Sequence, residues 1–195
     1  SNTAGTITSE TKANDFMSVS KFTGNGVVGA TFAHGLTKAP EFTINKTINS
    51  VYGWMCDGSV ISGNYIFLNT TNPKVASALV SDYDATLCTR NTNDIALNAT
   101  GVDYISYHFT SVPKQCKVGS YIGTGAAGNE VNVGFEPAWV MIKNTSAVAN
   151  WSIVDLQRGD DKTLAPNTSA IEDTAYNIDL DVDGFTLQDA FGQHN

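Results

Sequence analysis

The chain has 195 residues, and its 11 Lys and Arg stand against 19 Asp and Glu, which gives a net charge of −8. This balance disfavours nucleic-acid binding, because phosphates are held by clustered cations. No apolar run approaches the ~18 residues of a membrane-spanning helix, so no membrane insertion is expected. Only 15% of residues are charged, while Thr, Ser, Asn and Gly are abundant, a composition typical of extended all-β extracellular proteins.

Strand signals dominate the first half of the chain, because Gly, Asn, Thr and Ser interrupt every window before apolar residues recur at helical spacing. Residues 1–15 are expected to form an N-terminal extension or linker. Turn residues separate the expected strands, which are Met17–Phe22, Phe42–Lys46, Gly53–Cys56, Tyr65–Leu68, Thr86–Thr89 and Tyr104–Phe109. Segment Lys74–Val80 is expected to form one helical turn.

The last of these strands has two chemically different faces. Alternation places Tyr104, Ser106 and His108 on one face and Ile105, Tyr107 and Phe109 on the other. The second face is more apolar, so it is expected to face the core.

The second half of the chain continues in the same way. Its expected strands are Val118–Ile122, Trp139–Lys143, Trp151–Asp155, Tyr176–Leu180 and Phe185–Gln188. Short strands at near-regular spacing with turns between them favour antiparallel β-sandwiches or jelly rolls over any α/β arrangement. The expected fold class is therefore all-β.

Parts of the sequence occur twice. Ser18–Gly26 returns 99 positions later as Lys117–Gly125, with an aromatic residue followed by Gly-x-Gly in both copies. Further along the chain the offset shortens by two residues, and Ala39–Lys46 is similar to Glu136–Lys143 at an offset of 97. This self-similarity predicts two β-sandwich modules in tandem, at residues 16–112 and 113–195.

The second module lacks a counterpart of the strand Tyr104–Phe109. Either the natural chain continues beyond residue 195 or another chain donates the strand, because an unpaired apolar sheet edge is prone to aggregate. Continuation is the favoured interpretation.

The sharpest candidate for a metal site is the acidic run that ends at Gly184. Asp179, Asp181 and Asp183 stand at alternate positions, as in the opening of a calcium-binding loop. The twelfth position of that loop is Ala190, where a bidentate Glu is required. An acidic hairpin turn with Gly184 at its tight position is the favoured interpretation, and no cofactor or metal is expected.

No catalytic constellation is recognisable. His34, His108 and His194 lie far apart, and none has a second ligand at metal-binding spacing. Neither a Gly-x-Ser-x-Gly elbow nor an activated Cys accompanies them. The chain is therefore expected not to be an enzyme.

The remaining signals are interpreted as structural. The three cysteines are Cys56, Cys88 and Cys116; a buried reduced Cys56 and Cys88 is favoured over a disulfide. Aromatic and aliphatic residues of the expected strands should form the cores, namely Phe22, Phe42, Trp54, Ile105, Phe109, Tyr121, Trp139 and Trp151.

The sequence also resembles a module of large virion proteins of marine tailed bacteriophages. In the first half the likeness is carried by Gly5–Asn14, Phe16–Gly26, His34–Leu36 and Ala39–Phe42, and in the second by Gly119–Gly125, Gly134–Lys143, Asn150–Trp151 and Tyr176–Asp179. The resemblance implies paired β-sandwiches in tail-fibre-like or other surface-exposed structural proteins, without an established active site. The missing last strand and the acidic Asp181–Asp183 turn depart from the pattern of that family.

Together these signals predict a non-enzymatic structural protein of the extracellular phage particle, as a tail-fibre or receptor-binding unit. Its expected partners are other virion subunits, further copies of itself, and a host cell-surface glycan or protein. A capsid decoration or assembly protein that contacts only virion partners is the alternative. A bacterial surface or filament subunit completed by a donated strand is a weaker one.

Overall fold

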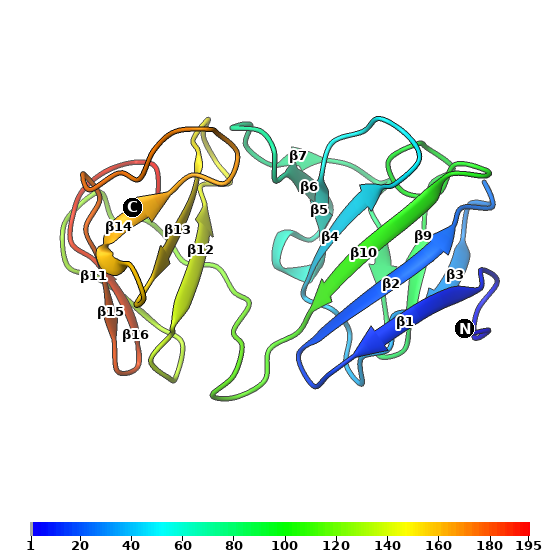
Figure 1. Ribbon diagram of the computed structural model, residues 1–195, viewed down its shortest axis with the longest axis horizontal. Helices are drawn as coiled ribbons and strands as arrows, with labels where there is room; N and C mark the ends of the chain where they lie inside the picture. The colour runs from blue at the N-terminus through cyan, green and yellow to red at the C-terminus, as the bar shows by residue number, and fades with distance from the viewer. Residues whose placement is uncertain (1) are drawn as a thin grey trace. The chain divides into compact units, whose positions relative to one another are not determined.

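The computed structural model describes residues 2–195, in which the regular secondary structure consists of antiparallel β-sheets and one short 3-10 helix at Ser59–Ile61, joined by turns and loops. The chain divides into two compact units (Figure 1). Unit 1 comprises the chain up to Phe67, Lys74–Val112 and Cys116–Gly119, and unit 2 comprises Leu68–Pro73, Pro113–Gln115 and Ser120–Asn195. No helix among residues 2–195 is long and apolar enough to cross a membrane.

Unit 1 is built on a seven-stranded sheet with the order β1-β2-β10-β4-β5-β6-β7 (Figure 1). Its strands are β1 Ser9–Ala13, β2 Met17–Thr23, β10 Asp103–Phe109, β4 Phe42–Thr47, β5 Met55–Asp57, β6 Asn64–Phe67 and β7 Val75–Ala76. The long strand β10 lies between β2 and β4, which are far from it in sequence. It therefore joins the two halves of the sheet.

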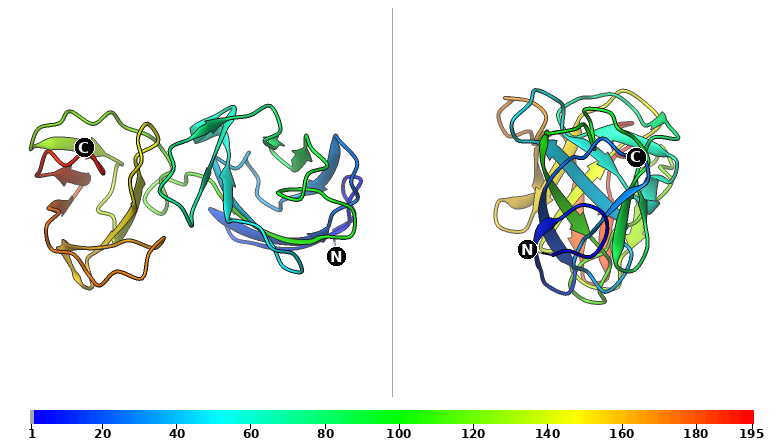
Figure 2. Two further views of the ribbon diagram at one scale, coloured as in Figure 1. Left: turned by 90° about the horizontal axis from the view of Figure 1, so that it is seen from above. Right: turned by 90° about the vertical axis from the view of Figure 1, so that its right-hand side faces the viewer.

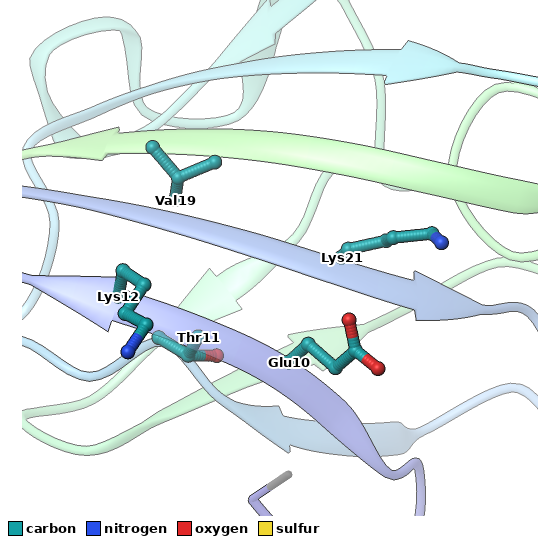
Figure 3. A pocket seen from close by; sticks show the side chains of 5 residues that line it. All are labelled: Glu10, Thr11, Lys12, Val19 and Lys21. Atoms are coloured by element: carbon teal, nitrogen blue, oxygen red, sulfur yellow. The ribbon is translucent and has the colours of Figure 1, made fainter.

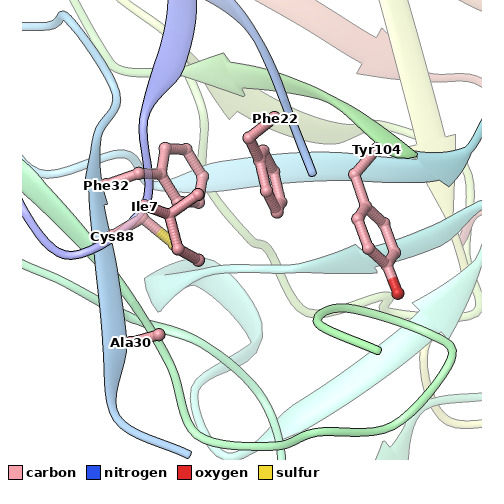
Figure 4. Close-up of a cluster of buried hydrophobic side chains, with 6 residues drawn as sticks. All are labelled: Ile7, Phe22, Ala30, Phe32, Cys88 and Tyr104. Carbon is pink, nitrogen blue, oxygen red and sulfur yellow. The ribbon is translucent and has the colours of Figure 1, made fainter. Parts of the chain in front are cut away.

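A smaller sheet forms the second layer of unit 1 (Figure 2). Its order is β3-β9-β8, with β3 at Ala30–Ala33, β9 at Leu87–Arg90 and β8 at Asp82–Tyr83. The layers meet in a cluster whose rings stack, with centroids of Phe22 and Phe32 4.3 Å apart and those of Phe22 and Tyr104 5.2 Å apart (Figure 4). Unit 1 is thus sandwich-like, as the sequence predicts.

Residues 2–15, the described part of the expected extension, do not form an extension. Strand β1 pairs with β2 along its whole length, from Ser9 opposite Phe22 to Ala13 opposite Ser18. Ile7 is buried in the core cluster. The chain before β2 is therefore part of the sandwich, and the strand was missed because Ser9–Ala13 has no apolar alternation.

The predicted inner face of β10 is wrong. Tyr104, Ser106 and His108 are fully buried, whereas Ile105, Tyr107 and Phe109 are only half-buried. The core accepts the more polar face because it contains hydrogen-bonding partners for it, which are described below.

Unit 2 consists of two three-stranded sheets, with the orders β12-β13-β14 and β11-β16-β15. The first contains β12 Trp139–Lys143, β13 Trp151–Asp155 and β14 Gly159–Leu164; the second contains β11 Asn129–Asn132, β16 Gly184–Leu187 and β15 Ile178–Asp181. An apolar core lies between them, formed by Ile142, Val154, Ile178, Leu180, Phe185 and Leu187.

Several other expectations need correction. Val118–Ile122 is not a strand, and Lys74–Val80 forms the short strand β7 and a turn instead of a helical turn. Trp151 is buried as expected, but Trp139 is 53% exposed. Phe42 and Trp54 are only half-buried.

The pairing registers of the two units nevertheless recur at the sequence offsets. Ile44 pairs with Cys56 in unit 1, and Met141 pairs with Ile153, 97 residues further on at both positions. In the smaller sheets Tyr83 pairs with Cys88, and Leu180 pairs with Phe185 at the same offset. Strand β11 lies 99 residues after β3. Unit 2 thus has counterparts of β3, β4, β5, β8 and β9, while the segment corresponding to β2 is not a strand.

One side-chain contact recurs with the same spacing. The Nζ of Lys46 donates to the Tyr52 carbonyl at 2.8 Å, and the Nζ of Lys143 donates to the Ala149 carbonyl at 2.8 Å. Lys143 also donates to the carbonyls of Asn144 at 2.9 Å and Thr71 at 3.1 Å. Burial lowers the pKa of Lys143. Each lysine therefore ties the loop between two central strands to the strand that precedes it.

We expect Lys143→Met to destabilise unit 2 by about 1–3 kcal/mol, because the variant leaves three carbonyls without their charged donor. Urea unfolding followed by ¹⁹F NMR of 5-fluorotryptophan would measure this at Trp139 and Trp151. Lys162→Met, at a half-buried position of β14, is the control and should change the midpoint little. Equal midpoints for the two variants would contradict a structural role of Lys143.

Candidate functional site

The most unusual feature of unit 1 is a buried arginine. Arg90, at the end of β9, is fully buried. Its Nη1 donates to Ser81 Oγ at 2.5 Å, and its Nη2 donates to Asn45 Oδ1 at 2.8 Å and to Ser106 Oγ at 2.9 Å. Its Cζ lies 5.2 Å from the Phe22 ring centroid and 5.0 Å from that of Phe32. Burial disfavours this charge, but the aromatic faces and three acceptors offset the cost.

A buried carboxylate balances the charge without touching it. Asp57, on β5, is fully buried. It accepts hydrogen bonds from Asn45 Nδ2 at 3.0 Å, the Tyr83 hydroxyl at 2.8 Å and the Ser81 amide at 3.0 Å. Asn45 accepts from Arg90 and donates to Asp57, so its amide bridges the two charges. We call this set the polar network, comprising Asn45, Asp57, Ser81, Tyr83, Arg90 and Ser106.

Two histidines extend the network toward one end of the core. The Leu36 amide donates to His34 Nδ1 at 3.2 Å, so the proton of the neutral ring lies on Nε2, which faces the Asp84 carbonyl at 3.1 Å. His108 Nδ1 lies 3.1 Å from Thr43 Oγ1. The two rings have centroids 5.8 Å apart. The sequence did not predict that these two residues lie together.

The surroundings make these groups chemically unreactive. Burial, followed by the charge of Asp57, raises the pKa of the Tyr83 hydroxyl well above its ordinary value. Burial raises the pKa of the Cys88 thiol to about 11, although Arg90 opposes the shift. A nucleophile or general base needs the opposite tuning and a path to solvent. The network is therefore suited to stabilising the fold.

The histidines should make the stability of unit 1 depend on pH. Burial lowers the pKa of His108 well below its ordinary value, and Arg90 and His34 add to the shift; burial also lowers the pKa of His34, although the Asp84 carbonyl opposes it. The unfolded chain takes up these protons near pH 6.5, before the folded one does. The stability that His108 provides should therefore be fully present above about pH 6.5 and fall by up to about 1.4 kcal/mol per pH unit below it. His34 should add to this fall in the same direction.

Urea unfolding at pH values between about 5 and 7.5 would measure how the unfolding free energy of unit 1 depends on pH. The readout is ¹⁹F NMR of the chain labelled with 5-fluorotryptophan, observed at Trp54. His108→Gln removes one titrating group. It should reduce the slope of the unfolding free energy against pH by up to about 1.4 kcal/mol per pH unit. The same slope in both proteins would exclude His108 as a source of the pH dependence.

In the core of unit 2, the positions that correspond to five residues of the polar network are all apolar. At the offset of 97 that relates the registers, Arg90 corresponds to Leu187, Asn45 to Ile142 and Asp57 to Val154. Likewise Ser81 corresponds to Ile178 and Tyr83 to Leu180. All five counterparts belong to the apolar core of unit 2. The same strand framework is thus filled once by a polar network and once by hydrocarbon.

The calcium candidate does not assemble. Among residues 2–195 the structure holds no group of three acidic, His or Cys side chains that could bind a metal ion. Asp179 accepts from Gln188 Nε2 at 2.7 Å, and Asp181 accepts from Thr186 Oγ1 at 2.6 Å. Gly184 begins β16, and a Cβ there would lie 2.0 Å from the Val131 carbonyl oxygen. The acidic run forms the hairpin turn between β15 and β16, where Asp181 pairs with Gly184, as the favoured interpretation expected. Close approach of β11 explains why a glycine is needed at position 184.

The other predicted residues lie apart from the network. His194 is buried in unit 2 with its Nε2 3.2 Å from Asp189 Oδ2. No disulfide is present among the described residues; Cys88 lies in the core cluster of unit 1, and Cys116 is half-buried. Arg90 was overlooked, although its alternation with the buried Cys88 along β9 was the available signal.

A depression lies on β1 and β2 at the outer surface of unit 1 (Figure 3), and a second one adjoins it around Asn14 and Met17. The first is lined by Glu10, Thr11, Lys12, Val19 and Lys21, and Glu10 stands opposite Lys21 across the two strands. This mixed-charge patch holds no buried polar group.

A family model described as a domain of unknown function (DUF7483) matches residues 1–195. No curated protein and no solved structure matches the chain. The family description names no activity, substrate or partner.

Proposed function

Because the chain belongs to the DUF7483 family, for which no activity is described, we propose its function from its own residues. It is a non-enzymatic structural module of a tailed-phage virion, displayed on the particle surface as part of a tail-fibre or receptor-binding protein. Two sandwich-like units of this kind provide a rigid contact surface that does not depend on catalytic groups.

The observation that carries the proposal is the burial of the reactive side chains of unit 1. Arg90, Asp57 and His108 are fully buried, and each is committed to the interior contacts described above. Groups that act on a substrate must reach it. Their burial instead favours a scaffold whose interior is fixed and whose loops contact partners.

The exposed loops supply a polar contact surface. Many of their residues are Thr, Ser and Asn, whose hydroxyl and amide side chains can both donate and accept hydrogen bonds. Such groups suit contacts with neighbouring subunits or with the hydroxyls of a host glycan. The resemblance to virion modules supports the location on a particle.

Immunogold electron microscopy with antiserum against the purified chain would test the proposal on particles of the phage whose genome encodes it. Label on tail fibres or the tail tip supports the proposal. Label confined to the head would favour the capsid decoration alternative. Particles that lack the chain altogether would overturn a virion role.

Binding to cells separates the two virion roles. The fluorescently labelled chain should bind host cells if it belongs to a receptor-binding protein, and the same chain unfolded by heat is the control. Binding to purified capsids but not to cells would overturn the tail-fibre assignment.

A further inference from the structure

One edge of unit 2 has the form of a strand-binding site. Strand β12 pairs only with β13 within the part of the chain that the structure describes. The Leu156 amide donates to the Ala138 carbonyl at 3.1 Å, and this bond continues the register of the pair. Because hydrogen-bonding alternates along antiparallel strands, Val140 and Ile142 bond to β13. Trp139, Met141 and Lys143 direct their backbone groups to the opposite edge.

In unit 1 the equivalent edge is occupied. Strand β4 corresponds to β12, and its outer edge holds β10, with Ile44 opposite Tyr107 and Phe42 opposite Phe109. The Ile48 amide donates to the Asp103 carbonyl at 2.7 Å, so Phe42, Ile44 and Lys46 are the residues that bond to β10. These are the positions that correspond to Trp139, Met141 and Lys143.

The β12 edge lacks the features that usually protect an exposed strand. Trp139–Lys143 contains one charged residue, no proline and no bulge. Trp139 is 53% exposed at the start of the strand. Long, apolar, unprotected edges are the surfaces to which proteins add strands from a partner.

The inner face of the edge determines which strand fits. In unit 1, Ser106 and His108 of β10 stand beside Asn45 and Thr43, which are polar. The corresponding residues of β12 are Ile142, in the apolar core, and Val140, packed against it. A strand that placed Ser and His there would bury polar groups without partners, which is costly.

We infer that the outer edge of β12 binds an extended segment of a partner protein as an added antiparallel strand. The partner segment takes the register that β10 has on β4. It carries apolar side chains at the two positions that face Val140 and Ile142, where β10 has His108 and Ser106. This inference does not depend on the proposed virion role.

Synthetic peptides would test the inference on the full chain. The first has the sequence Asp103–Phe109 with Ser106→Val and His108→Leu, and the second has the unaltered sequence, each with terminal lysines for solubility. We expect the first to shift the tryptophan emission to the blue, to raise the unfolding midpoint of unit 2, and to bind at least about tenfold more tightly than the second. Absence of binding by both peptides, or equal binding, would overturn the inference.

Backbone methylation distinguishes strand addition from a non-specific apolar contact. An N-methyl group at the position of Tyr107, whose amide faces β12 in the expected register, should abolish binding. The same group at the position of Ser106, whose amide faces away, should leave binding unchanged. The reverse pattern would exclude this register.

Variants of the chain complete the test. Met141→Pro removes an amide that points away from β13, so the pair β12–β13 keeps its bonds, and peptide binding should be lost. Met141→Ala retains the amide and should bind like the parent chain. A chain that dimerises alone, and that Met141→Pro makes monomeric, would show that the edge pairs with itself and would overturn the assignment of a different partner.

Discussion

Replacing Arg90 with alanine should destabilise unit 1 by about 3–5 kcal/mol, because Asp57 would stay buried with its charge uncompensated. The Ser81 and Ser106 hydroxyls would each lose the guanidinium as a donor, and Asn45 Oδ1 would keep only the hydrogen bond from Ser106. The two phenylalanine rings would also face a cavity where the guanidinium stacks. Against a total stability of about 5–15 kcal/mol for a domain, such a loss brings unit 1 close to unfolding.

Urea unfolding of the chain labelled with 5-fluorotryptophan would measure this loss unit by unit. Trp54 reports on unit 1, whereas Trp139 and Trp151 report on unit 2. We expect the Trp54 transition of the variant to move to lower urea and the other two to stay in place. A change of less than about 1 kcal/mol at Trp54 would contradict the role of the network in stability.

Removing the whole network should have a much smaller effect than breaking it. The core of unit 2 provides the template for an apolar replacement at the paired positions, which consists of Asn45→Ile, Asp57→Val, Ser81→Ile, Tyr83→Leu and Arg90→Leu, with Ser106→Ala to remove the remaining hydroxyl. Well-packed apolar residues in place of a buried ion pair are often neutral or stabilising by about 1–4 kcal/mol. A sixfold variant less stable than Arg90→Ala would show that the network contributes net stability.

Leu187→Arg, the reciprocal change, should unfold unit 2. Leu187 is fully buried among Val154, Ile178 and other aliphatic side chains. A guanidinium there would have neither acceptors nor aromatic faces like those around Arg90, so its burial should cost on the order of 5 kcal/mol or more. Amide hydrogen exchange read by mass spectrometry should show lost protection in β12, β13, β15 and β16, and unchanged protection in unit 1.

Leu187→Met, which nearly conserves volume, is the matched control and should cost less than about 1.5 kcal/mol. Adding Ile142→Asn and Val154→Asp to Leu187→Arg supplies the counterparts of Asn45 and Asp57. Partial recovery of protection would show that the three positions are coupled as they are in unit 1. Full protection in the Leu187→Arg single variant would contradict the claim that the apolar core of unit 2 cannot hold a guanidinium.

Local sequence predicted the strands that carry an alternating apolar pattern. The bounds expected for Trp139–Lys143 and Trp151–Asp155 are those of β12 and β13. Strands such as Ser9–Ala13 and Gly159–Leu164 were missed, because they contain few apolar residues and are recognisable only by the strand beside them. Pairing with a neighbour supplies their hydrogen bonds, and no local signal is needed.

The sequence by itself determined the all-β class, because turn residues and alternating apolar residues lie close together in the chain. It also determined the offset of 97 at which the register of β4–β5 recurs in β12–β13, whereas the offset of the smaller sheets was decided by their pairing. Only the tertiary structure decided which face of β10 is buried. Its polar face lies inside because Asn45, from β4, and Arg90, from β9, meet Ser106 there. Burial of a polar group is acceptable only where partners satisfy it, and strands distant in the sequence bring those partners together.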